Sequence, residues 1–289
     1  GGMMAMETDI NWEQIWAEDY EQYRQTMRAD SDDGVYWSKR AEDFSNSRRT
    51  NDFEYGRQVL NSLWNRVLTP ESVVMDVGAG PGTFVIPFAR KVKRIDAVEP
   101  APGMVDKIKE NAQREGIANF GIINSTWQDV DAASVSDKYD LVISSLVIWV
   151  FKDVWRQLRR MEQASKGYCC VVTGAKSKNE HGDILWQQIN GNKENIWHST
   201  QQYPLIYSLL YSKGRLPNVS IVNYTSERSV DDKVRHLKLC FERRIPVTPD
   251  IEKIIREYFT AKSENDTIKE PGQAAVIWWR AHGFENEDR

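Results

Sequence analysis

The stretch Val73–Thr83 reads VVMDVGAGPGT, and the stretch Ile95–Glu99 that follows it reads IDAVE. The first is an apolar run that ends in glycines at alternate positions, and the second ends in a carboxylate 21 positions after Gly78. Glycines without a Cβ let the chain turn sharply off a strand and let a ligand approach the main chain. A carboxylate at the tip of the next strand can accept charge-assisted hydrogen bonds from two ribose hydroxyls. The pattern therefore predicts a nucleotide-binding strand–helix–strand unit.

The spacing of the glycines indicates which nucleotide is bound. The dinucleotide fingerprint is G-x-G-x-x-G. Here Gly78, Gly80 and Gly82 alternate and Asp76 precedes them, which gives D-x-G-x-G-x-G and disfavours NAD. An ordinary strand-to-helix turn is the alternative to a binding loop, but the paired acid at Glu99 and the strands that follow argue against it.

This arrangement resembles that of the class I S-adenosylmethionine (SAM)-dependent methyltransferases, whose first motif has the same acid before the glycines. The resemblance covers roughly residues 71–175 together with two later strands. It implies an enzyme that takes SAM as its cofactor and releases S-adenosylhomocysteine (SAH).

The resemblance also implies a role for each motif residue. Asp76 would lie near the methionyl ammonium group of SAM, with Gly78 and Gly80 under the methionine moiety. Glu99 would bind the ribose, and Met104, five residues later, would pack against the adenine. The full cofactor site expected on this basis consists of Asp76, Gly78, Ala79, Gly80, Gly82, Glu99, Pro100, Met104, Thr126, Trp127 and Ser144.

The third strand departs from the family pattern. In the family this strand usually leads to an acid followed by a small or apolar residue, and together these bind the edge of the adenine. Here Thr126 stands at the place of the acid and Trp127 follows it. Either Thr126 or Asp129 bonds the adenine amino group, or only main-chain groups do. We expect Trp127 to form a wall of the adenine pocket, the alternative being ordinary core packing.

Strands that alternate with helices dominate the middle of the chain. They are expected at 73–77, 94–98, 120–124, 139–145 and 168–174, with two further strands at 219–224 and 274–280. Such alternation predicts an α/β fold, here a Rossmann-like sheet of seven mostly parallel strands with helices on both faces. Ligands of such sheets bind beyond the carboxyl ends of the strands. The residues expected to converge there are Gly78, Glu99, Trp127 and Ser144.

The segments outside the sheet are expected to form a helical cap. Residues 1–70 would form an N-terminal helical lid, with Tyr36, Trp37 and Arg40 as candidates to close over the cofactor, and residues 71–289 the SAM-binding core. Cap insertions are expected at about 177–215 and 230–268, the second with two helices separated by a proline. Plain packing of the aromatic side chains in a helical core is the alternative to a lid.

Methyl transfer asks little of a protein beyond the alignment of two reactants in a dry pocket. A general base matters when the acceptor is a hydroxyl or a thiol, and His181 and His198 in the first cap insertion are weak candidates. No role is assigned to His236, because a surface helix is expected there. The segment Ile143–Trp149 lacks the Asn/Asp-Pro-Pro-aromatic sequence typical of methyltransferases that act on adenine amines or certain amides, which disfavours those acceptors.

Composition limits the kinds of molecule that the chain is expected to bind. The chain has 289 residues, a formal net charge of −4 and a pI near 5.7, which makes a nucleic-acid partner unlikely. The longest apolar run, residues 141–151, is too short to cross a membrane. No basic segment with a cleavable apolar run opens the chain, so we expect a cytoplasmic protein. The spacing of cysteines and histidines predicts no metal site.

The sequence thus predicts a SAM-dependent methyltransferase of a small organic acceptor. Its 11 tryptophans either shape a pocket for a flat or apolar acceptor or build helical cores. Two other functions stay open on the same fold, because a fold does not determine a substrate. One is an RNA or protein methyltransferase, and the other is a non-catalytic SAM-binding protein.

Overall fold

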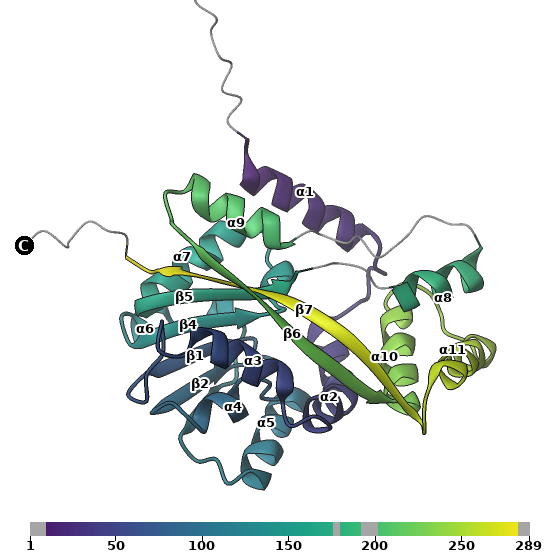
Figure 1. Ribbon diagram of the computed structural model, residues 1–289. Coiled ribbons are helices and arrows are strands. Elements are labelled where there is room, and N and C mark those ends of the chain that lie inside the picture. The colour runs from purple at the N-terminus through teal and green to yellow at the C-terminus, as the bar shows by residue number, and fades with distance from the viewer. Residues whose placement is uncertain (1–9, 176–179, 192–201, 283–289) are drawn as a thin grey trace, which may run out of the picture.

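The computed structural model describes residues 10–175, 180–191 and 202–282. A seven-stranded sheet runs through it in the order β3-β2-β1-β4-β5-β7-β6 (Figure 1). Neighbouring strands are parallel except at β7, which is antiparallel to both β5 and β6. The predicted seven-stranded α/β fold is confirmed. The strands are β1 (Val73–Val77), β2 (Arg94–Val98), β3 (Phe120–Ile123), β4 (Tyr139–Ser145), β5 (Ser165–Gly174), β6 (Asn218–Ser229) and β7 (Thr267–Arg280).

The helices surround this sheet, and several begin at the residue types that favour a helix start. Ser229 and Thr248 accept main-chain hydrogen bonds as N-caps, and Pro249 occupies the first turn of its helix. None of the helices in the described ranges is long and apolar enough to cross a membrane. They are α1 (Trp12–Gln25), α2 (Asp33–Arg49), α3 (Glu54–Leu63), α4 (Val85–Ala89), α5 (Pro102–Arg114), α6 (Ala132–Val135), α7 (Val154–Ala164), α8 (Glu180–Asn190), α9 (Gln202–Ser212), α10 (Val230–Glu242) and α11 (Pro249–Lys262).

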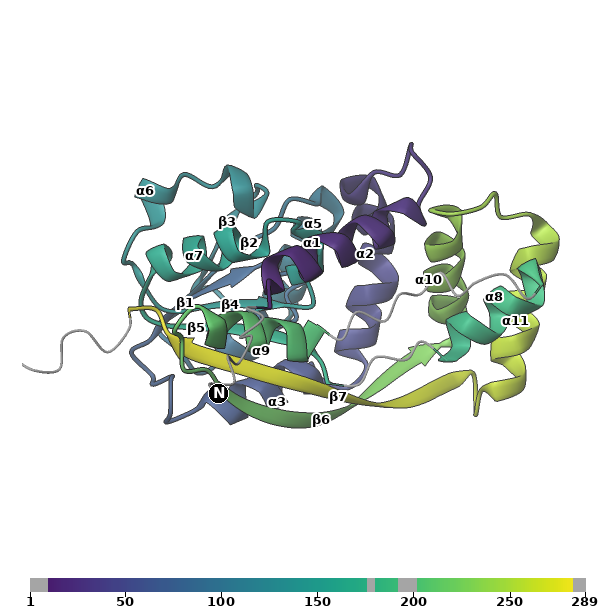
Figure 2. The same ribbon diagram turned by 90° about the horizontal axis from the view of Figure 1, so that it is seen from above.

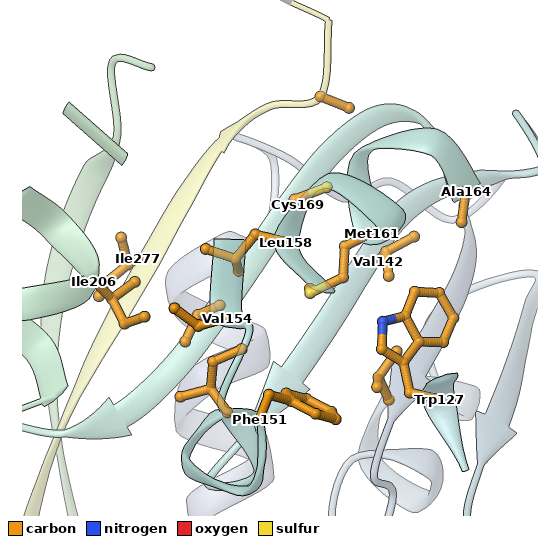
Figure 3. Packing of buried hydrophobic residues seen from close by; sticks show 14 of the residues in the cluster. Trp127, Val142, Phe151, Val154, Leu158, Met161, Ala164, Cys169, Ile206 and Ile277 are labelled. Carbon is orange, nitrogen blue, oxygen red and sulfur yellow. The ribbon is translucent and has the colours of Figure 1, made fainter. Parts of the chain in front are cut away.

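Two apolar clusters, one on each face of the sheet, form the core. Successive strand residues point to opposite faces, so the neighbouring thiols of Cys169 and Cys170 belong to different clusters. Figure 3 shows part of the first cluster, in which Trp127 lies near Met161 of α7. Strands buried on both faces read as nearly continuous apolar runs. An acid such as Asp76 within β1 is therefore exceptional.

The last two strands are much longer than the sequence predicts. β6 extends to Ser229 and β7 begins at Thr267, and together they form an arm that carries α8, α10 and α11 at its far end (Figures 1 and 2). We call this group of three helices the lobe. It has an apolar cluster of its own, which includes Trp186 of α8, Phe241 of α10 and Phe259 of α11.

The helix α2 spans the gap between the sheet and the lobe (Figure 2). Toward the sheet it packs on α5, where Asn111 donates a hydrogen bond to Ser45 Oγ at 3.0 Å. Toward the lobe it packs on α10, where the Tyr36 hydroxyl lies 3.0 Å from Cys240 Sγ. α2 is therefore held from both sides.

The other helices of the expected cap take separate positions. α1 packs against α7 and α9, where Trp16 Nε1 donates to the carbonyl of Phe151 at 2.7 Å, and α3 packs under β6. The two helices of the first insertion also separate. α8 joins the lobe through Leu185, whereas α9 packs on the sheet through Ile206.

We expect the lobe to depend on its aromatic centre. Phe241 is fully buried, so Phe241→Ala should lower the free energy of unfolding by about 3–5 kcal/mol through lost burial and a residual cavity. Urea unfolding followed by circular dichroism measures this change. Tyr211 on α9 is 63% exposed, and Tyr211→Ala is the matched control, expected within about 0.5 kcal/mol of the parent. Equal effects of the two substitutions would contradict this account of the lobe.

Candidate active site

A cavity of about 720 Å³ lies beyond the carboxyl ends of the parallel strands. Its floor is made by the turns that follow β1, β2, β3 and β4, and α2 covers it. β6 and α10 contribute its far wall. The volume falls within the range of about 300–1,000 Å³ typical of small-molecule sites.

The glycine turn after β1 adopts a backbone that only glycine takes up readily. Gly78 has φ +75° and Gly80 has φ +56°, both in the left-handed region. A Cβ on Gly78 would lie 2.4 Å from Val147, so packing as well as φ demands glycine there. A Cβ on Gly80 would lie 3.3 Å from the ring of Phe44 on α2. The covering helix therefore approaches this turn closely.

The carboxylate of Glu99 joins the turns that follow β1 and β2. Its Oε2 accepts the N–H of Gly80 at 2.8 Å, and its Oε1 accepts the N–H of Ala101 at 2.9 Å. Burial raises the pKa of Glu99, and the two main-chain hydrogen bonds act in the opposite direction. Because a carboxylate has about four lone-pair sites, both oxygens keep capacity for ligand hydroxyls.

Asp76 is buried in the cavity lining without a partner. Its side chain is 2% exposed, and the described residues supply it with no hydrogen bond or ion pair. Burial, and secondarily the charge of Glu99, raises the pKa of Asp76 to about 8. A buried acid of this kind is stabilised as a carboxylate by hydrogen-bond donors or by a cation, and a ligand ammonium group would supply both.

The third expected part of the site comes from α5 and from the residues that follow β3. Met104 is buried beside Ala101, and Trp127 is both a core residue and part of the cavity lining. The two interpretations of Trp127, core packing and cavity wall, are thus compatible. The Thr126 hydroxyl donates to Asp129 Oδ2 at 2.6 Å, and Asp129 itself does not line the cavity.

The structure brings most of the predicted cofactor residues to one cavity. Gly82 lies outside the lining, where its N–H bonds the carbonyl of Ala79 at 3.2 Å and closes the turn before α4. Ser144 is also outside, because side chains alternate along β4 and Ser145 faces the cavity instead. The predicted residues on the lining are Asp76, Gly78, Ala79, Gly80, Glu99, Pro100, Met104, Thr126 and Trp127.

The histidines are placed differently from the expectation. His181 does not line the cavity, since its ring bonds Tyr258 Oη on α11 at 2.8 Å and Glu270 Oε1 on β7 at 2.7 Å. His198 lies outside the described residues. His236, for which a surface helix was expected, lines the cavity from α10. The error follows from the helix periodicity of α10, which cannot show that one of its faces meets β6 across the cavity.

Several residues outside the methyltransferase motifs also line the cavity, some of them predicted and others not. Of the proposed lid residues, Trp37 and Arg40 line the cavity, whereas Tyr36 is buried beside it. Arg48 and Arg228 also line the cavity, and the sequence did not predict a role for either. No local signal marks them, because they approach the cavity only after the arm and α2 have packed.

The residues of the cavity fit SAM. The unpartnered acid at Asp76 suits its methionyl ammonium group, and the carboxylate of Glu99 suits a ribose diol. The turn at Gly80 leaves the main chain accessible, because no Cβ stands between it and the cavity. Groups of three or more metal-binding side chains are absent from the part of the chain that the structure describes.

Comparison with known proteins agrees with this geometry. Residues 74–166 match the model of a methyltransferase domain. An uncharacterized protein of Haemophilus influenzae is 24% identical over 248 residues, which cover 85% of this chain and 88% of that protein. A probable ribosomal RNA small subunit methyltransferase A of Methanosphaera stadtmanae is 33% identical over 84 residues, which cover 29% of this chain and 30% of the relative.

Solved structures share the fold. A SAM-dependent methyltransferase from Aquifex aeolicus superposes with a TM-score of 0.52 and 11% identity, covering 87% of this chain and 100% of that one. The match of residues 74–166 to a methyltransferase domain and this shared fold agree with the resemblance seen in the sequence. The protein is a methyltransferase whose methyl donor is SAM and whose cofactor product is SAH.

We expect SAH binding to depend on the ionisation of Asp76. With a pKa of about 8 the acid is mostly protonated at pH 6, and it must lose its proton to pair with the ligand ammonium group. Affinity should therefore rise between about pH 6 and pH 8, by at most about tenfold per pH unit. Asp76→Asn should bind SAH weakly and without this dependence. Calorimetry in two buffers of different ionisation enthalpy would also show proton release, and pH-independent binding by the parent would contradict the assignment.

The same raised pKa predicts the pH dependence of stability in the ligand-free protein. The folded state binds the Asp76 proton more tightly than the unfolded chain does. The free energy of unfolding should therefore fall as the pH rises from near 3.8 toward 8, and less so in Asp76→Asn. Urea unfolding across this pH range measures the difference. If the free energy of unfolding changes with pH in the same way in the parent and in Asp76→Asn, the prediction is wrong.

Glu99 should be needed for cofactor affinity. In Glu99→Gln an amide NH₂ must face one of the two main-chain N–H donors, at Gly80 or Ala101, and the charge is lost. SAH affinity should fall about 10- to 100-fold, which corresponds to about 1.5–3 kcal/mol for a charged hydrogen bond. Glu110→Gln on the exposed face of α5 is the matched control. Equal affinity in the two variants would show that the ribose lies elsewhere.

Proposed function

We propose that this methyltransferase acts on a small organic acceptor. The observation that carries the proposal is that one cavity extends from the expected cofactor residues to a region covered by α2 and walled by β6. An acceptor in that region would meet the cofactor without leaving the protein interior. Water exclusion and close alignment are what this reaction needs.

The wall of the expected acceptor region is aromatic. The rings of Trp37 and Trp149 lie 6.4 Å apart, and those of Tyr55 and Tyr224 lie 4.8 Å apart. Phe44 continues this surface toward the glycine turn. Aromatic walls bury large apolar areas and favour flat or apolar ligands. The surface therefore supports an acceptor with a flat or apolar body.

The chain's own residues supply binding and shape. When bound, the cofactor offers an electrophilic sulfonium methyl group, to whose carbon the acceptor's lone pair bonds while the carbon–sulfur pair returns to sulfur. Tyr55 Oη lies 2.7 Å from Ser145 Oγ at the end of β4. Burial raises the pKa of Tyr55, so its phenol stays neutral and serves as a hydrogen-bonding group rather than as a base.

An RNA acceptor has weaker support. The relative named as a ribosomal RNA methyltransferase matches less than a third of this chain. The formal net charge of −4 also gives little attraction for a phosphate backbone. A protein that merely holds the cofactor would need no aromatic region beyond it.

Incubation with SAM should transfer a methyl group to a component of a small-molecule extract. Mass spectrometry detects the mass gain of one methyl group together with SAH. Glu99→Gln, which removes a group of the expected cofactor site, is the negative control, and total RNA is the competing substrate. Methylation of RNA with no small-molecule product would contradict the proposal.

A further inference from the structure

The end of the cavity between α2, β6 and α10 carries positive charge that the protein does not neutralise. Arg48 on α2 is 7% exposed, and its Nε has no hydrogen-bond partner among the described residues. Its guanidinium lies over the rings of Phe44 at 4.7 Å and Tyr55 at 5.1 Å. Ring faces attract a cation but supply no hydrogen-bond acceptor of the kind a guanidinium uses.

Arg228 on β6 is partly buried and also has no ion-pair partner among the described residues. Its Nε is also unpartnered within the described part of the chain, and its Nη1 donates to His236 Nδ1 at 2.7 Å. Burial, and then the nearby charges of Arg40 and Arg48, lower the pKa of Arg228 to about 10. Cations gathered in a buried place without counter-ions are unfavourable unless something outside the chain compensates them.

The acids near this cationic end already have partners. Asp43 accepts from Arg40 Nε at 2.9 Å, and Glu270 is bound by Lys233. These are the two acids whose charges raise the pKa of Arg228, and neither forms an ion pair with it in the described structure. Three further acids are nearby: Asp32 caps α2, Asp33 pairs with Arg243, and Asp232 accepts from Asn46.

The geometry also fixes the role of His236. A guanidinium can only donate, so Nδ1 of His236 is the acceptor and the ring proton of the neutral imidazole is on Nε2. Burial, together with Arg40, Arg228 and Lys233, lowers the pKa of His236, which keeps the ring neutral. A neutral ring with a proton on Nε2 presents one more hydrogen-bond donor beside two arginines.

We infer that Arg48, Arg228 and His236 bind an anionic oxygen group, a carboxylate or a phosphate, on the methyl acceptor. The inference rests on the proposed function, and it narrows the acceptor to a flat or apolar molecule that bears an acid. Guanidinium groups match both anions in bidentate geometry. Arg228 and His236 lie outside the matched domain at 74–166, on the arm and lobe, whereas the expected cofactor residues lie inside it.

The test uses the parent protein saturated with SAH and three probes of similar shape. Benzoate and phenyl phosphate carry the anion, and benzamide is the neutral counterpart of benzoate. Calorimetry should show at least one anionic probe binding about tenfold or more tightly than benzamide. The stronger of the two identifies the anion. Benzamide binding as tightly as both acids would overturn the inference without any variant.

Single substitutions then test which side chains bind the anionic probe. Arg48→Gln and Arg228→Gln should each weaken binding of the anionic probe about 10- to 100-fold, while SAH affinity changes less than about threefold. Arg256→Gln, on the exposed side of α11, is the matched control and should change neither affinity. Because neither replaced cation has an ion-pair partner among the described residues, the variants should unfold at the same or a higher temperature than the parent.

Two outcomes would distinguish a failure of this inference from a failure of the proposed function. If Arg228→Gln weakens SAH as much as the anionic probe, the cations hold the cofactor's own carboxylate and the inference is overturned. If the parent binds no SAH but still binds the anionic probe through Arg228, the anion site stands and the proposed function falls.

Discussion

Ionisable side chains that have no ion-pair partner among the described residues lie at both ends of this cavity. Asp76 lies at the end formed by the glycine turn, and Arg48 and Arg228 lie at the end formed by α2 and the arm. A buried unpaired charge costs several kcal/mol, whereas a ligand that binds only the folded state returns that free energy. In the proposed complex, opposite charges at the two ends orient the cofactor and the acceptor toward each other.

Each end is supported by a different kind of structure. The acid end belongs to a parallel sheet buried on both faces, and the two hydrogen bonds to Glu99 fix the β1 and β2 turns relative to each other. The cationic end is assembled from α2, β6 and α10, which are far apart in sequence. The contact of Tyr36 with Cys240 holds two of these elements together.

The arm explains how a common fold acquires its own acceptor region. The matched domain ends at residue 166, before β6 and β7. These two strands run past the sheet and hold a lobe with a separate apolar cluster, so Arg228 and His236 can face a cavity built on the standard cofactor edge. Since fold does not determine function, specificity is expected in such additions.

The sequence predicts the order of strands and turns along the chain because their signals are local. For the same reason, nine of the residues expected to bind the cofactor do line the cavity. Glycine spacing and an acid within an apolar run are each contained in a few consecutive residues. Ser144 does not line the cavity although β4 has the predicted bounds, because the face on which each side chain of a strand lies is determined by the packing of the sheet. The partners of Arg48, Arg228 and His236 depend instead on how α2, β6 and α10 pack. Burial and proximity across nearly two hundred residues are properties of the tertiary structure alone, so only the fold shows that these cations share a cavity with Asp76.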